Sequence, residues 1–380
     1  MEMALKNLKY IKIILIALIF YNVFSVVYSH KDLYTFNYWH NFSDLKKMVY
    51  DSVYKNKHGN FIKDFYLYSY SAGALIKGES PIITNPEAPP LGKYLIGASI
   101  LIFNNPNVVI FLFSLLSLFL MYLVGKQIFG NSLIASLPPL LFSFEPIFKN
   151  QLIYTPLLDL MQLSFLLLIF YFFNRARITR NSFFNIFLSA VFLGAFISTK
   201  FFGSGAAIIV ALVIPLLIHK DYMRLKQLII SLPVAVLFLY STYLKVLLDG
   251  YPLNKFLGIQ KWIFLYNTGH LRQPFTIWPL LLINKWYNGN AIAYDPQWFI
   301  TWPLITVISF LTLMRSFIAR NTKLEIEILL VWSLSYLILM SLGDASARYF
   351  VILIPVLYII ATYGVYEFLV FKFPKLKRYL

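Results

Sequence analysis

The segment Asn85–Tyr94, with the sequence NPEAPPLGKY, stands directly before an apolar run and limits how the chain can cross a membrane. It holds three prolines, a glycine, one carboxylate and one ammonium group, and the run LGKYLIGASILIF (residues 91–103) overlaps its end. A helix of that length reaches about 20 Å, whereas the hydrocarbon core of a bilayer is about 30 Å thick. We therefore expect residues 91–103 to form an interfacial helix on the outer membrane surface.

The composition of the rest of the chain predicts an all-α, polytopic membrane protein. Of its 380 residues, 59% are hydrophobic and 13% are charged, whereas soluble domains contain about 25% charged residues. The net charge of +17 is typical of basic cytoplasmic loops, and no basic stretch carries the motif of a nucleic-acid module. We therefore expect membrane lipids, and not nucleic acid, as partners. Cysteine is absent, which excludes disulfide and thiolate chemistry.

Hydrophobic runs of about 17–22 residues predict about ten transmembrane helices, the first of them uncleaved. Both chain ends are basic, so both are expected in the cytoplasm, which requires an even number of spans. The runs lie near 11–29, 107–126, 131–148, 156–174, 182–199, 203–219, 227–246, 297–315, 325–342 and 347–370.

Two long segments are predicted on the outer side of a cell membrane. Residues 30–106 contain two helix-like stretches, near 43–56 and 62–77, and residues 247–296 are rich in Trp, Tyr, Pro and Asn. Long loops in a compact protein are usually functional. We expect one transmembrane domain over 1–380, with no separate soluble domain and with the active site on the outer face.

Several charged residues lie where a membrane makes charge expensive. Glu145 and Asp159 fall in or beside predicted spans, which marks them as functional candidates. Lys200 and Arg348 stand at the outer ends of spans, where two cations suit a lipid phosphate. Each could instead be an ordinary interface anchor.

The sequence contains no strong metal or nucleotide motif. The five histidines lack the spacing of a metal site, and no P-loop or Asp-x-Asp pair occurs. We expect no required cofactor, although the outer carboxylates could hold a divalent metal.

Five motifs in order resemble the protein O-mannosyltransferases and related lipid-phosphate-sugar glycosyltransferases of the GT-C class. In the first outer loop, Asp64 is followed by FYLYSYSAGALIKG and then by EAPPLGKYLIG. The later motifs are LLD ending at Asp159, STKFFG around Lys200, IWPLLL around Trp278 and RYFVILIPVL from Arg348. The resemblance covers roughly residues 60–370 and implies the GT-C fold.

The chain departs from the mannosyltransferase pattern at three positions. The family's acidic residue after the loop Asp is Phe65, its His before the double proline is Ala88, and an expected Arg is Tyr154. The EAPP sequence instead resembles the Glu-x-Pro-Pro of aminoarabinose transferases, which share the fold. These departures leave the donor sugar and the acceptor open.

The resemblance implies transfer of a mannose-like sugar from a polyprenyl (dolichyl-type) phosphate to an acceptor hydroxyl, with inversion. The acceptor could be protein Ser/Thr, a lipid or a glycan. Asp64 would act as general base and Glu87 would position the acceptor or the sugar. Cations would hold the leaving phosphate. Lys200 and Arg348 would bind the donor phosphate, and Trp278 would stack on the sugar. Asp159, Lys93 and Tyr154 would line the substrate cavity, with Lys93 near lipid headgroups.

Other interpretations stay open at this point. Asp64 could be a solvated carboxylate at a helix N-terminus, and Trp278 could be an interface anchor. The whole chain could be a polyprenyl-phosphate flippase or transporter, although it lacks the inverted repeats typical of transporters. An inactive scaffold would explain Phe65 and Tyr154.

Overall fold

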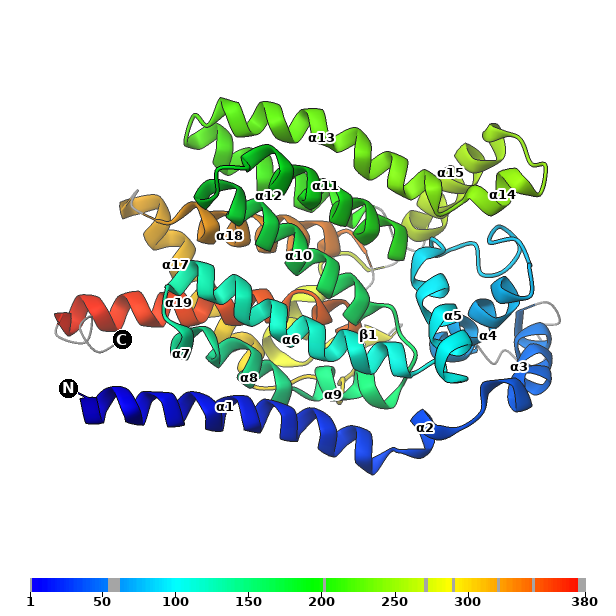
Figure 1. Ribbon diagram of the computed structural model, residues 1–380, viewed down its shortest axis with the longest axis horizontal. Coiled ribbons are helices and arrows are strands. Elements are labelled where there is room, and N and C mark those ends of the chain that lie inside the picture. The colour runs from blue at the N-terminus through cyan, green and yellow to red at the C-terminus, as the bar shows by residue number, and fades with distance from the viewer. Residues whose placement is uncertain are drawn as a thin grey trace.

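The computed structural model describes residues 2–53, 62–200, 203–269, 273–288, 291–319, 322–343 and 346–374. Long helices run side by side in a bundle, and short helices cover one of its ends (Figure 1). The start of α1 and the end of α19 lie together at the opposite end (Figure 1). The long helices are α1 (Glu2–Ser29), α6 (Val108–Phe129), α10 (Asp159–Ile178), α11 (Ser182–Thr199), α12 (Ser204–Ile218), α13 (Tyr222–Ser241), α17 (Thr301–Ala319), α18 (Leu324–Ser341) and α19 (Ile354–Lys372).

The chain is a multi-pass membrane protein. Within the described residues, six helices are long and apolar enough to cross a bilayer. They are α1 from Tyr10, α6, α11, α13, α18 and α19. Shorter or more polar helices, among them α10 and α12, share the bundle with them. The expected count of about ten spans stays a prediction.

The predicted span at 131–148 is broken into three short helices: α7 (Ser132–Ala135), α8 (Leu137–Phe144) and α9 (Pro146–Ile153). A proline explains the break between α8 and α9, because a residue before proline avoids the helical conformation. Glu145, which precedes Pro146, is extended with ψ 134°. The apolar pattern predicted the start of this segment, but it missed the interruptions and the extension to Ile153.

Helix α10 lies at the centre of the bundle. It packs between α6 and α11, while α11 also packs on α13, α12 on α18, and α17 on α19. Most of α10 is buried in protein, including Leu160, Leu163 and Phe170. By contrast, α1 contacts mainly the α7–α9 segment and leaves much of its apolar surface exposed, as expected of a helix that faces lipid.

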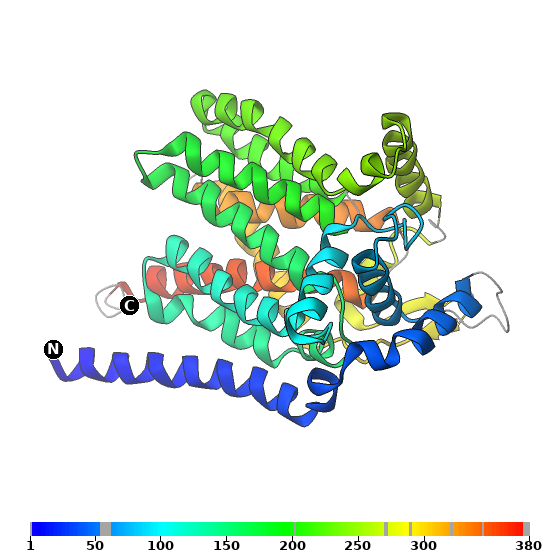
Figure 2. The ribbon, with the colours of Figure 1, turned by 45° about the vertical axis from the view of Figure 1, so that its right-hand side comes forward.

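The two predicted outer segments fold into short elements at the end of the bundle away from both termini (Figure 2). The first holds α2 (Asp32–Thr35), α3 (Tyr38–Val53), α4 (Asp64–Ile76) and α5 (Leu91–Phe103); the second holds α14 (Leu244–Leu248), α15 (Leu253–Gly269) and α16 (Ile277–Ile283). Helices α3 and α4 confirm the two predicted stretches, with shifted bounds for α3, and α5 matches residues 91–103.

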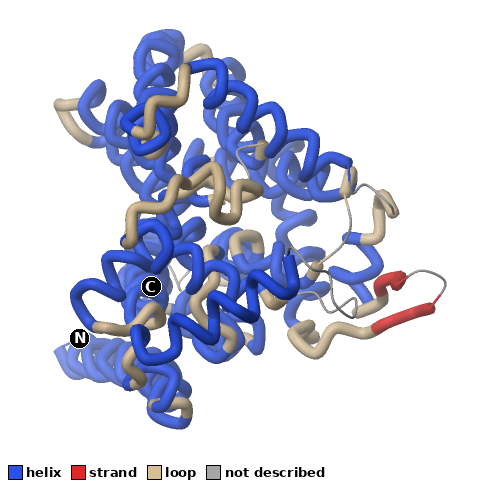
Figure 3. The backbone as a smooth tube through the Cα atoms, turned by 90° about the vertical axis from the view of Figure 1, so that its right-hand side faces the viewer, coloured by secondary structure: helices blue, strands red, loops and turns tan. Residues whose placement is uncertain are grey.

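A small antiparallel hairpin is the one addition to the expected all-α fold in the described residues. Strand β1 (Trp286–Asn288) pairs with β2 (Ala291–Ala293), with Trp286 opposite Ala293. It projects from the second outer segment (Figure 3). Runs of three residues are too short for a period-two pattern to be recognised in the sequence.

Candidate active site

Four predicted site residues from distant parts of the chain form one continuous chain of ion pairs. The Oδ1 atom of Asp159 lies 2.5 Å from Lys200 Nζ, and its Oδ2 atom accepts from Arg348 Nε at 2.8 Å. The same guanidinium donates through Nη1 to Asp64 Oδ2. Arg348 therefore bridges the two carboxylates, and Lys200 ends the chain on the other side of Asp159.

Each of the four residues stands at an end of a helix. Asp64 is the first residue of α4 and Asp159 the first of α10, where the helix dipole favours a negative charge. Lys200 directly follows α11, and Arg348 belongs to the short 3₁₀ helix η2 (Ala347–Val351). Because these ends meet at one end of the bundle, motifs spread over most of the sequence converge on one site.

Burial differs along this ion-pair chain. The exposed fraction of the side chain is 2% for Asp159, 18% for Lys200, 19% for Arg348 and 46% for Asp64. Both carboxylate oxygens of Asp159 are thus shielded from water, while the side chain of Asp64 is open to solvent. Its Oδ1 atom makes no hydrogen bond within the described ranges, so this oxygen is available to a hydroxyl group.

Three tyrosines that the sequence did not single out complete the surroundings of Arg348 and Lys200. Tyr68, one turn after Asp64, is buried, and its phenol lies close enough to Arg348 for the guanidinium charge to act on it. Burial raises the pKa of the Tyr68 phenol, which therefore stays protonated. The ring of Tyr349 lies 5.2 Å from Lys200 Nζ, and Tyr336 Oη donates to the Tyr349 carbonyl at 3.0 Å.

The position of Lys93 corrects the expectation that it lies near lipid headgroups. Its side chain is completely buried, and Nζ donates to the carbonyls of Asn85 at 2.6 Å and Ala88 at 2.8 Å. Burial lowers the pKa of Lys93 to about 7, while the nearby Glu87 carboxylate opposes this shift. Lys93 therefore shapes the 85–88 loop from the inside.

Glu87 lies in this loop, close enough to Asp64 for their charges to repel. Its Oε1 atom accepts from the side-chain amide of Asn85. Burial raises the pKa of the Glu87 carboxyl, and the charge of Asp64 raises it further. The structure thus brings Glu87 beside the outer end of the ion-pair chain.

Gly92 explains how the loop comes so close to the buried charges. A Cβ atom at Gly92 would lie 2.6 Å from Leu158 Cδ2 and 3.3 Å from Thr199 Cγ2. These two residues directly precede Asp159 and Lys200. The absence of a side chain at Gly92 therefore lets α5 pack against the start of α10, which carries Asp159, and the end of α11, which Lys200 follows.

Two of the departures from the mannosyltransferase pattern meet in space. The rings of Phe65 and Tyr154 are 6.3 Å apart between centroids. Phe65 adjoins Asp64, and Tyr154 is 48% exposed at the end of α9. An aromatic pair thus occupies the two positions where the resemblance predicts an acidic residue and an arginine.

Trp278 is tied to the bundle by its polar edge. Its Nε1 atom donates to Ser341 Oγ at 2.8 Å, which fixes α16 to the end of α18. Within the described ranges, no hydrogen bond joins Trp278 to the ion-pair chain, and sugar stacking by Trp278 stays a prediction. Phe201 and Phe202 of the STKFFG motif lie outside the described residues.

Glu145, the other carboxylate predicted near a span, is completely buried at the break between α8 and α9. It accepts hydrogen bonds from Thr301 Oγ1, from Tyr358 Oη and from Trp302 Nε1, the last at 3.0 Å. The Trp302 ring packs on Phe350 of η2 with centroids 5.0 Å apart. Glu145 therefore joins α9, α17 and α19 behind the helix that carries Arg348.

No group of three or more His, Asp or Glu side chains in the described part of the chain is arranged to hold a metal ion. Arg348 lies between the carboxylates of Asp64 and Asp159, and its charge together with that of Lys200 balances theirs.

A protein-family model matches part of the sequence that carries this site. Residues 87–244 match the family model described as dolichyl-phosphate-mannose-protein mannosyltransferase. This segment, less than half of the chain, contains Glu87, Asp159 and Lys200. Asp64 and Arg348 lie outside it and join it through the ion pairs. No curated protein gives a significant match to the sequence.

Solved structures share the fold at low sequence identity. ArnT from Cupriavidus metallidurans, bound to undecaprenyl phosphate, superposes with a TM-score of 0.59 and 16% identity over 79% of this chain and 55% of its own. The apo oligosaccharyltransferase of Archaeoglobus fulgidus gives a TM-score of 0.50 and 11% identity over 96% of this chain and 52% of its own. The chain thus spans about half the length of these proteins. Their similarity confirms the GT-C fold expected from the sequence motifs.

Proposed function

We propose that this chain, which has the GT-C fold, is a membrane glycosyltransferase that moves a sugar from a polyprenyl-phosphate donor to an acceptor hydroxyl. The observation that carries the proposal is the ion-pair chain Asp64–Arg348–Asp159–Lys200, beside Glu87. It combines an exposed carboxylate with two partly shielded cations, as inverting transfer from a lipid phosphate requires. The match to the mannosyltransferase family model favours a mannose-like sugar.

In the proposed reaction, the acceptor oxygen attacks the anomeric carbon while the bond from that carbon to the phosphate oxygen breaks. The acceptor proton passes to Asp64, and the electron pair of the broken bond stays on the leaving phosphate. One attack from the face opposite the phosphate inverts the anomeric centre. Glu87 holds the acceptor or a sugar hydroxyl.

Lys200 and Arg348 stabilise the charge that develops on the phosphate. Both are paired with Asp159 in this structure, so a donor phosphate would join or replace these contacts. Asp159 keeps the cations in place before the donor arrives, which reduces the reorganisation needed during the reaction. The same proposal assigns no required role to a divalent metal, because Arg348 already supplies positive charge between the two carboxylates.

The test is transfer by the purified full chain, supplied with polyprenyl-phosphate mannose, glucose or aminoarabinose and with hydroxyl acceptors. Asp64→Asn should lower the transfer rate by about 10²- to 10⁴-fold, the usual contribution of a general base. Asp32→Asn is the matched control, because Asp32 also begins a helix in the first outer segment. Near-full activity of Asp64→Asn would remove Asp64 as base. Movement of the intact donor between leaflets, without sugar transfer, would instead support the transporter interpretation.

A further inference from the structure

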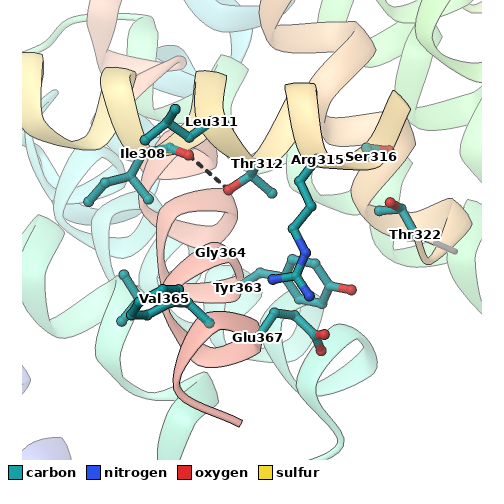
Figure 4. Close-up of a pocket in the computed structure, with 11 residues that line it drawn as sticks. Ile308, Leu311, Thr312, Arg315, Ser316, Thr322, Tyr363, Gly364, Val365 and Glu367 are labelled. Carbon is teal, nitrogen blue, oxygen red and sulfur yellow. Dashed lines mark hydrogen bonds between the residues drawn. The ribbon is translucent and has the colours of Figure 1, made fainter. Parts of the chain in front are cut away.

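A pocket lies between α17 and α19 (Figure 4), toward the end of the bundle that holds the chain termini (Figure 1). Its volume is about 420 Å³, within the range of small-molecule sites. Arg315 and Ser316 of α17 border it on one side, and Tyr363 and Glu367 of α19 on the other. None of these residues belongs to the proposed active site.

The pocket begins beside a close contact between α17 and α19. A Cβ atom at Gly364 would lie 2.2 Å from Thr312 Oγ1, so the backbone of α19 touches α17 at this point. The Thr312 hydroxyl donates to the Ile308 carbonyl at 2.8 Å (Figure 4). One turn further along both helices, Arg315 and Glu367 replace these small groups, and their long side chains border the pocket.

Among the lining residues that the structure describes, Arg315 is the positive group and Glu367 the negative one. Arg315 points from α17 toward Tyr363 and Glu367 (Figure 4). No ion pair joins Arg315 to Glu367 among the residues that the structure describes. The guanidinium carbon of Arg315 lies 6.0 Å from the ring centroid of Phe371, a long cation–π contact that leaves its N–H donors available.

The walls of the pocket are apolar and face outward. Leu311 is 60% exposed and Phe368 is 56% exposed, and both line the pocket. On helices of a membrane protein, such side chains are covered by lipid tails. The pocket thus combines polar groups, Arg315 and Glu367, with an apolar outer wall, and this combination fits an amphipathic molecule.

We propose that this pocket binds a phospholipid whose headgroup carries both a phosphate diester and a primary ammonium. The phosphate would bind Arg315, whose fork of N–H donors matches phosphate oxygens. The ammonium would donate to Glu367 and to the Tyr363 hydroxyl, while an acyl chain covers Leu311 and Phe368. Charge complementarity selects this headgroup: an anionic lipid leaves Glu367 unpaired beside a second negative group, and a trimethylammonium has no N–H to donate.

Native mass spectrometry of the full chain tests the proposal, with dioleoyl phosphatidylethanolamine, phosphatidylglycerol and phosphatidylcholine as probes. The wild type should retain phosphatidylethanolamine several-fold more than the other two. Glu367→Gln should remove the preference over phosphatidylglycerol, and Arg315→Gln should weaken retention of all three. Glu327→Gln is the control, because Glu327 is a carboxylate of α18 that pairs with His219 and lies outside the pocket.

Two outcomes would overturn the proposal. Equal retention of the three lipids by the wild type would show a surface without headgroup selection. An unchanged preference in Glu367→Gln would show that the selection arises elsewhere. Because glutamine keeps the size of glutamate, this variant remains informative even if Arg315→Gln fails to fold. Sugar-transfer activity is not the readout, so the result does not depend on the proposed function.

Discussion

At the scale of single residues, the site depends on how Asp159 divides its two oxygens between Lys200 and Arg348. Asp159 is almost completely buried, so each cation compensates a charge that would otherwise be costly. Of the two cations that pair with Asp159, Arg348 also pairs with Asp64, whereas Lys200 does not. Its removal therefore tests phosphate binding while leaving the contact between Arg348 and Asp64 intact.

Lys200→Met should raise the KM for the polyprenyl-phosphate donor by about tenfold or more, which corresponds to about 1.4 kcal/mol of binding free energy. The expected cause is the loss of one cation facing the phosphate. Steady-state kinetics at varied donor concentration measures it. Lys149→Met is the control, since Lys149 belongs to α9 and is not part of the ion-pair chain. An unchanged KM for Lys200→Met would argue against phosphate contact.

Glu87 gives a prediction about pH. Burial raises the pKa of its carboxyl. As the pH is lowered, Glu87 therefore becomes protonated at a higher pH than an exposed glutamate would. If ionised Glu87 positions the acceptor, the transfer rate should fall across this higher range. In Glu87→Gln, the rate should be lower overall and the acid limb should move to lower pH. A pH profile of kcat/KM measures both, and an acid limb at the same pH in the variant would assign it to another group.

The sequence predicted the charged residues of the site better than their neighbours. Asp159, Lys200 and Arg348 were recognisable because charge at the end of an apolar run is rare. Asp64 was recognisable only because it opens the first motif of the family resemblance. Tyr68 was not recognisable, because it is one of several tyrosines in FYLYSYSAG and only the rotation of α4 decides which one faces Arg348.

At the scale of elements, the PPLGK stretch acts through contacts that no local pattern reveals. Lysine beside an apolar run is typical of a headgroup anchor, yet Lys93 turns inward to loop carbonyls. The bounds of α5 were predictable from the apolar run that follows the prolines. The close packing at Gly92 depends on α10 and α11, which are distant in sequence.

Gly92→Ala should destabilise the protein by about 1–3 kcal/mol, because overpacking a filled interface forces side chains or backbone to shift. Leu158 is completely buried and has little room to move away. Thermal unfolding in detergent measures the effect, together with the transfer rate. Gly258→Ala is the matched control: Gly258 is also helical, and an added Cβ there meets nothing within 4 Å. Equal behaviour of the two variants would contradict the packing role of Gly92.

At the scale of the whole molecule, the fold separates two ends with different chemistry. One end carries the ion-pair chain and both outer segments, and the other carries the chain termini (Figure 1). Basic residues gather at the second end: Arg175 and Arg177 lie in the last turn of α10, Arg180 follows that helix, and Lys372 ends α19. The positive-inside rule would place this end in the cytoplasm and the proposed active site on the outer face.

The absence of cysteine from the chain makes this orientation directly testable, because each introduced thiol is the only one to react. Lys47→Cys puts a thiol on the exposed surface of α3, and Arg180→Cys puts one between α10 and α11. In intact cells, a membrane-impermeant maleimide should label Lys47→Cys, whereas Arg180→Cys should react only after the membrane is opened. Labelling in the reverse order would move the proposed site to the cytoplasmic face. That result would exclude an outer-face acceptor while leaving the ion-pair chain, and hence the chemistry inferred from it, unchanged.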